Sequence, residues 1–168
     1  TAGRCSRSAS NVREASPDLI VASGDLTSSG SLPQLTCFRE AIEAVSKPVF
    51  PLFGGHDGKE ERLQKRAGNT FTMNYEAALG PSYYSFDWGG RHFSFYPNEQ
   101  LFFSPADCQR KETWFWADLG LQPEDRQIVV VVHTPPPVSF LDALGSYPVR
   151  LVLYGHWHSS KVFSYGNM

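Results

Sequence analysis

Apolar residues along the chain occur as short continuous runs separated by a stretch with helical period. Residues 19–23 form one run and residues 48–53 form another, and glycine follows each of them directly. Runs of this length that end on glycine are typical of buried parallel strands. Between them, apolar side chains recur every three or four positions and predict an amphipathic helix at about 33–46. This order predicts a parallel sheet with functional residues at the carboxyl ends of its strands.

Residues 83–96 alternate aromatic and polar positions around Gly89-Gly90, which predicts a tight turn between two antiparallel strands. In this register one face of the hairpin is almost wholly aromatic, because Phe86 faces Phe93 across the strands. We prefer the interpretation that this face packs into the core over one in which it forms an aromatic wall for a substrate. His92 falls on the opposite face and is predicted to lie at the surface.

The second half of the chain predicts one long helix and two further strands. Ser104 followed by Pro105 predicts the start of the helix, because the hydroxyl caps it and proline fits its first turn. Residues 128–132 are β-branched and residues 151–154 are apolar, so both predict buried strands. Three prolines at 135–137 exclude regular structure directly after the first of these strands.

Composition sets the broad class of protein. A chain of 168 residues with 41% hydrophobic and 19% charged residues is expected to form a single globular domain over 1–168. Its net charge of −2 gives no electrostatic reason to expect nucleic acid as a partner, and no apolar run has the length of a membrane span. Cys5, Cys37 and Cys108 contain no C-x-x-C pair, which argues against a disulfide framework and a thiolate zinc site.

Both ends of the chain are expected to be cut from a longer protein. The chain begins at Thr1 rather than Met, and residues 1–17 form a polar leader without the hydrophobic stretch of a signal peptide. Met168 follows shortly after a predicted strand. The compartment and the oligomeric state are therefore left open.

Four of the five histidines lie in three short motifs, each at the end of a predicted strand. Hydrolysis of a phosphoester requires an activated water and stabilisation of charge on phosphate oxygens, and two divalent metals achieve both. Imidazole and carboxylate ligands suit Mn, Zn or Fe. Asp25 is the best bridging carboxylate, and His156 and His158 would point to one side of an extended segment. The three histidine motifs, together with Gly24-Asp25, form the candidate ligand set: Gly54-Gly55-His56-Asp57, His133-Thr134-Pro135-Pro136 and Gly155-His156-Trp157-His158.

In their order, these motifs resemble the calcineurin-like metallophosphoesterase family over nearly the whole chain. The stretch Tyr-Tyr-Ser-Phe-Asp-Trp-Gly-Gly-Arg-His-Phe at 83–93 resembles a hairpin of its bacterial, cyclic-nucleotide-phosphodiesterase-like branch. The resemblance implies an α/β fold with two mixed β-sheets sandwiched by helices, and two divalent metals. It also implies the following roles: Asp25 as the bridging ligand, His133 and His156 as ligands of the second metal, His158 as a ligand of the first, His56 near the leaving group, and Asp57 as the acid that orients His56.

Two departures from the family pattern reduce the expected ligand set. No Asp-x-His motif occurs in residues 1–24, and Gly55 stands where the family has a metal-binding asparagine. Asn69, Asn74 or a water are open alternatives for that missing ligand. We therefore predict that this chain holds at most one metal firmly, at the second site.

Three functions follow from these observations. The preferred one is a metal-dependent phosphomonoesterase or phosphodiesterase that uses a metal-activated water on a phosphoester substrate of open identity. The alternatives are a catalytically degenerate protein-binding module, which the Gly55 departure favours, and a single-metal hydrolase with altered chemistry. The loop at 58–75 carries four basic residues, for which we prefer a solvated helical face over a phosphate-recognition lid. These residues are Lys59, Arg62, Lys65 and Arg66.

Overall fold

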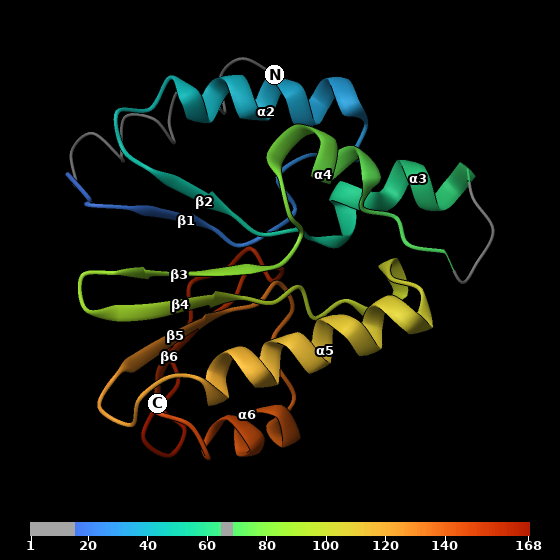
Figure 1. Ribbon diagram of the computed structural model, residues 1–168. Helices are drawn as coiled ribbons and strands as arrows, with labels where there is room; N and C mark the ends of the chain where they lie inside the picture. Colours follow the sequence, from blue (N-terminus) through green and yellow to red (C-terminus); the bar gives the residue numbers. More distant parts are fainter. Residues whose placement is uncertain (1–15, 65–68) are drawn as a thin grey trace.

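The structure, a computed structural model, describes residues 16–64 and 69–168 and shows two β-sheets between layers of helices (Figure 1). The first sheet pairs β1 and β2 in parallel, and the second has the order β3-β4-β5-β6. Within the second sheet only the β3–β4 pair is antiparallel. The strands are β1 (Ile20–Ala22), β2 (Val49–Pro51), β3 (Tyr84–Trp88), β4 (Arg91–Phe95), β5 (Gln127–Val131) and β6 (Val149–Leu153). The helices are α2 (Leu32–Glu43), α3 (Lys59–Gln64), α4 (Met73–Leu79), α5 (Pro105–Gly120) and α6 (Val138–Leu144), with 3₁₀ turns η1 (Gly55–Gly58) and η2 (Gln100–Phe102).

The aromatic face of the β3–β4 hairpin packs against the first sheet, which confirms the preferred interpretation. Phe50 of β2 stacks on Phe86 of β3 with ring centroids 4.0 Å apart, and Phe86 stacks on Phe93 at 5.3 Å. Helices α2 and α4 cover the outer side of the first sheet, and α5 and α6 cover the outer side of the second (Figure 1). The expected sandwich of two sheets between helices is therefore confirmed.

The carboxyl ends of strands from both sheets meet at one edge. The segment after β5 contacts the segment after β1, because the His133 ring bonds to the Ser23 carbonyl oxygen. The segment after β6 joins them, since the N–H of Gly155 donates to the carbonyl oxygen of His133 over 3.0 Å. This is the edge at which the strand–helix–strand pattern predicted the functional residues.

Of three short helices, α4 and α6 were not predicted from the sequence. The third, α3, begins at Lys59 and supports the helical interpretation of the basic segment, although Lys65 and Arg66 lie outside the described residues. Helix α6 begins directly after Pro137, and α4 begins at Met73. Each spans about two turns, which is too short for apolar periodicity to emerge. Helix α5 has the predicted cap, because the Asp107 N–H donates to Ser104 Oγ over 3.2 Å.

His92 is buried rather than at the surface, so that prediction was wrong. Its side chain does lie on the face opposite the aromatic residues, but α5 covers that face and leaves His92 only 5% exposed. The ring binds two carboxylates: Nδ1 lies 2.8 Å from Asp87 Oδ1, and Nε2 lies 3.0 Å from Asp118 Oδ2. Alternation along a strand assigns a residue to a face but does not indicate what covers that face.

Replacing His92 with alanine is expected to lower the free energy of unfolding by about 1–3 kcal/mol at mildly acidic pH, because Asp118 loses a buried partner. Burial lowers the pKa of His92, but the bonds to Asp118 and Asp87 outweigh it and raise the pKa above 6.5. The charged pairs therefore stabilise the fold fully below that value, and their contribution is lost as pH rises through the raised pKa. Denaturant titrations of both proteins between about pH 5.5 and pH 8.5 measure this, and a difference independent of pH would contradict it.

The described residues add two observations on compositional expectations. Cys37 and Cys108 are free cysteines in the part of the chain that the structure describes, and Cys5 lies outside it. Within residues 16–64 and 69–168, no helix combines the length and apolar character needed to cross a bilayer.

Candidate metal centre

Three of the predicted ligands sit on turns with left-handed backbone. Asp25, His156 and His158 have φ values of 53°, 68° and 52°. Residues other than glycine seldom adopt this conformation, and such strained positions concentrate at functional sites. The expectation of an extended segment at 156–158 was therefore wrong, because both histidines turn the chain after β6.

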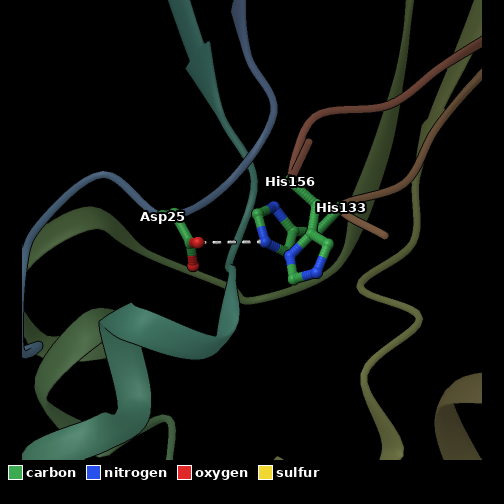
Figure 2. A group of neighbouring side chains, drawn as sticks. All are labelled: Asp25, His133 and His156. Carbon is green, nitrogen blue, oxygen red and sulfur yellow. Dashed lines mark ion pairs between the residues drawn. The ribbon is translucent and has the colours of Figure 1, made fainter. Parts of the chain in front are cut away.

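Asp25, His133 and His156 converge although 131 positions separate the first from the last (Figure 2). Each offers a ligand atom, and these atoms all lie within 4.8 Å of one another. Oδ2 of Asp25 is 3.2 Å from Nε2 of His133, and the rings of His133 and His156 meet nearly edge to face with centroids 5.3 Å apart. These are the three residues predicted for the second metal.

The hydrogen bonding of His133 leaves a lone pair facing the carboxylate. Nδ1 donates to the Ser23 carbonyl oxygen over 2.7 Å, so Nε2 of the neutral ring is an acceptor. His133 is 1% exposed, and in the neutral ring its Nε2 meets no hydrogen-bond donor among the residues that the structure describes. With a neutral ring, Nε2 and Asp25 Oδ2 are thus two acceptors that face each other, with His133 buried and Asp25 partly exposed. Only a proton or a metal cation between such groups stabilises this arrangement, so the residues present fit a divalent metal.

Electrostatics at Asp25 and His133 favour a charged pair. Burial raises the pKa of Asp25, but the bonds from His133 and from the His56 N–H outweigh it and bring the pKa below its ordinary value. Burial lowers the pKa of His133, but the bonds to Asp25 and to the Ser23 carbonyl raise it above 6.5 overall. A proton on His133 therefore supplies the cation that these two groups require when no metal is bound.

The two residues predicted to act on the leaving group, His56 and Asp57, lie in η1 beside this group. The His56 backbone N–H donates to Asp25 Oδ1 over 2.8 Å, and the exposed His56 ring donates from Nδ1 to the Ser28 carbonyl oxygen over 3.0 Å. The fully buried Asp57 carboxylate accepts from the N–H groups of Leu26, Thr27 and Gly54 and from Thr27 Oγ1. The Asp57 carboxylate therefore links two segments, the turn that contains Asp25 and the residue after the end of β2. The carbonyl oxygen of Ser28 fixes the His56 ring.

An open pocket of about 380 Å³ lies over the three converging residues. His158, predicted as a ligand of the first metal, lines this pocket and is exposed. Ser159 and Ser160 extend the polar lining beyond it. The structure thus places all four predicted metal ligands at one pocket, and brings three of them within ligand distance of one another.

A sequence model of the family described as calcineurin-like phosphoesterase matches residues 6–160. The chain belongs to the calcineurin-like phosphoesterase family. It is also similar to a protein of Synechococcus sp. named as a probable cyclic nucleotide phosphodiesterase, with 27% identity over 90% of this chain. The chain spans 62% of the length of that relative.

The structure adds two residues of this calcineurin-like chain that sequence reasoning missed. Asn98 Oδ1 accepts from the N–H groups of His133 and Thr134, and its Nδ2 donates to the Thr134 carbonyl oxygen. Glu99 follows directly and lies next to Gly55. The sequence carried a signal for both, because a polar pair follows β4 and a strand parallel to β5 ends at the same edge as His133.

Replacing Gly24 with alanine is expected to disrupt the calcineurin-like site. Gly24 has φ of +84°, and a Cβ there would lie 2.5 Å from His133 Nδ1. The matched control is Gly90→Ala, since Gly90 has φ of +77° with nothing within 4 Å of a Cβ. Backbone strain alone costs about 1–2 kcal/mol in both variants.

The collision with His133 should make Gly24→Ala lose at least about 2 kcal/mol more unfolding free energy than Gly90→Ala. Gly24→Ala should also lose metal affinity, because the ring can no longer bond to Ser23. Thermal denaturation and Mn²⁺ titration of both variants measure this. Equal losses of stability and affinity would show that the close approach does not constrain the His133 ring.

Proposed function

We propose that Asp25, His133 and His156 bind one divalent transition metal and that this centre hydrolyses a phosphodiester. The observation that carries the proposal is the convergence of three ligand atoms within 4.8 Å of one another, with His133 Nε2 only 3.2 Å from Asp25 Oδ2. Nδ1 is held by the Ser23 carbonyl oxygen, so the lone pair of Nε2 becomes available to a metal when the ring is neutral.

When bound, the metal would act as a Lewis acid toward the phosphate and lower the pKa of a bound water. The chain's own residues position the reacting groups. Asp25 is held for ligation by the His56 N–H, and His133 by the Ser23 carbonyl oxygen and by Asn98. The Asp57 carboxylate binds backbone N–H groups of the turn at Asp25 and of Gly54, so we assign Asp57 a positioning role.

The His56 ring is proposed to act on the leaving group. Its Nδ1 donates to the Ser28 carbonyl oxygen, which keeps a proton there in either protonation state. The protonated ring then carries a second proton on Nε2 that can pass to the departing oxygen, after which the ring is neutral. His158 lines the same pocket and is proposed to face the substrate or a first metal.

The choice of a phosphodiester over a monoester rests on the relative named as a probable cyclic nucleotide phosphodiesterase. The open polar pocket is compatible with it, since about 380 Å³ accommodates a phosphate with a substituent on each side. Bis-p-nitrophenyl phosphate and p-nitrophenyl phosphate test this choice directly. The proposal expects Mn²⁺-dependent turnover of the diester that a chelator removes and added Mn²⁺ restores.

A non-catalytic binding module is the second candidate, and Gly55 favours it because glycine cannot supply the family's metal ligand. This candidate expects no turnover of either substrate with Mn²⁺ or Zn²⁺ present. Such a result in a folded protein that holds Mn²⁺ would replace the proposed hydrolase with the module. Turnover of the monoester alone would retain the hydrolase and reject the phosphodiester.

A further inference from the structure

The space beside Gly55 is filled by a carboxylate from another part of the chain. A Cβ on residue 55 would lie 2.6 Å from Glu99 Oε1 and 3.0 Å from Phe102 Cε2. Asn74, one alternative for the missing asparagine, instead donates its side-chain amide to the Gly30 carbonyl oxygen. The Glu99 carboxylate therefore occupies the space into which the side chain of the family's asparagine would extend from residue 55.

One oxygen of Glu99 lacks a partner. The Gly55 N–H bonds to the carboxylate, whereas the buried Oε2 makes no hydrogen bond to any residue within 16–64 and 69–168. Leaving a buried carboxylate oxygen unsatisfied costs about 1–3 kcal/mol or more. Burial raises the pKa of Glu99, and the charge of His133 acts in the opposite direction.

The segment that carries Glu99 is anchored on both sides. Asn98 binds the backbone of His133 and Thr134. The ammonium of Lys111, which is 1% exposed in α5, donates to the Pro97 carbonyl oxygen over 2.5 Å and lies 3.9 Å from the centre of the Phe103 ring. A segment held this firmly presents the Glu99 carboxylate to the site at little entropic cost.

We propose that Glu99 is a metal ligand that replaces the family's asparagine, so that four side chains of this chain hold the metal: Asp25, His133, His156 and Glu99. This inference rests on the proposed function. The Glu99 carboxylate is not one of the ligand atoms that lie within 4.8 Å of one another. Metal binding therefore includes a movement of the Glu99 side chain toward the other three.

The test is Mn²⁺ affinity, read from the loss of the electron paramagnetic resonance signal of free Mn²⁺. Glu99→Ala is compared with Glu124→Ala, which removes the same charge from an exposed turn at the opposite end of β5. The double variant Gly55→Asn/Glu99→Ala restores the family's asparagine in the space that Glu99 leaves. Thermal denaturation followed by circular dichroism reports whether each variant folds.

Glu99→Ala is expected to raise the Kd for Mn²⁺ at least about tenfold, and Glu124→Ala less than about twofold. The double variant is expected to return to within about threefold of the wild-type Kd. A restored Kd in the double variant distinguishes metal ligation by Glu99 from a role in binding the Gly55 N–H. An asparagine side chain at position 55 could ligate the metal but could not bind that N–H in place of Glu99.

Equal Kd values for Glu99→Ala and Glu124→Ala, with Mn²⁺ bound by the wild type, would overturn the role of Glu99 and leave the proposed function intact. A cooperatively melting double variant that binds no better than Glu99→Ala would also overturn it. If the double variant does not melt cooperatively, the comparison of the two alanine variants decides alone. A wild-type chain that binds no Mn²⁺ would overturn the proposed function itself.

Discussion

Replacing Asp25 with asparagine is expected to abolish firm metal binding and to lower Mn²⁺-dependent turnover of bis-p-nitrophenyl phosphate at least about a thousandfold. The variant keeps the shape of the side chain and an oxygen for the His56 N–H, which donates to Oδ1 over 2.8 Å. It removes the negative charge that faces His133 Nε2 at 3.2 Å. Loss of several kcal/mol of metal-derived stabilisation corresponds to about three factors of ten in rate.

Asp125→Asn is the matched control, because Asp125 is exposed in the turn before β5. Saturating Mn²⁺ stabilises a protein that binds it by about 2.7 kcal/mol at a concentration of 100 Kd. The melting temperature of the wild type and of Asp125→Asn should therefore rise by several degrees with Mn²⁺, and that of Asp25→Asn should not. An equal rise in all three proteins would place the bound metal elsewhere.

Replacing His56 with alanine is expected to lower turnover about 10²–10³-fold while the metal content per chain stays unchanged. General acid catalysis contributes a factor of this size, and the His56 ring is exposed and held by the Ser28 carbonyl oxygen rather than by a metal-binding residue. The bond from the His56 backbone N–H to Asp25 survives the substitution. Steady-state kinetics and metal analysis on the same samples measure the two effects separately.

Ser28→Ala is the control for this experiment, because it alters the Ser28 side chain and leaves the carbonyl oxygen that orients the ring. Its turnover should lie within about twofold of the wild type. A parallel fall of turnover and metal content in His56→Ala would contradict the leaving-group role and assign His56 to the support of Asp25.

The strands and the edge of the sheet that carries the site were predictable from the sequence, because both depend on local patterns. Apolar runs that close on Gly24 and Gly54 mark strand ends, and parallel strands bring such ends together. That rule and the chemistry of metal ligands together indicated Asp25, His133, His156 and His158, and the family resemblance assigned the first three to one metal. Gly24 also explains a contact in the fold, since only a residue without Cβ permits the approach of the His133 ring.

What the sequence did not reveal depends on contacts between distant segments. The burial of His92 results from α5, which packs on the hairpin. The residue of α5 that contacts His92 is Asp118, 26 positions later in the chain. The left-handed turns at His156 and His158 were not predicted either, because two histidines two positions apart suggest an extended segment. Glu99 fills the space beside Gly55 from 44 positions away, as Gly55 and Glu99 lie on turns that follow strands of different sheets.

The metal content of the purified chain tests the central claim most directly. The wild type and Asp25→Asn would be saturated with Mn²⁺, passed through a desalting column and analysed by inductively coupled plasma mass spectrometry. The account predicts about one Mn²⁺ per wild-type chain, held by the centre at Asp25, His133 and His156, and none per Asp25→Asn chain. No metal in the wild type, two firmly held metals, or the same content in both proteins would contradict it.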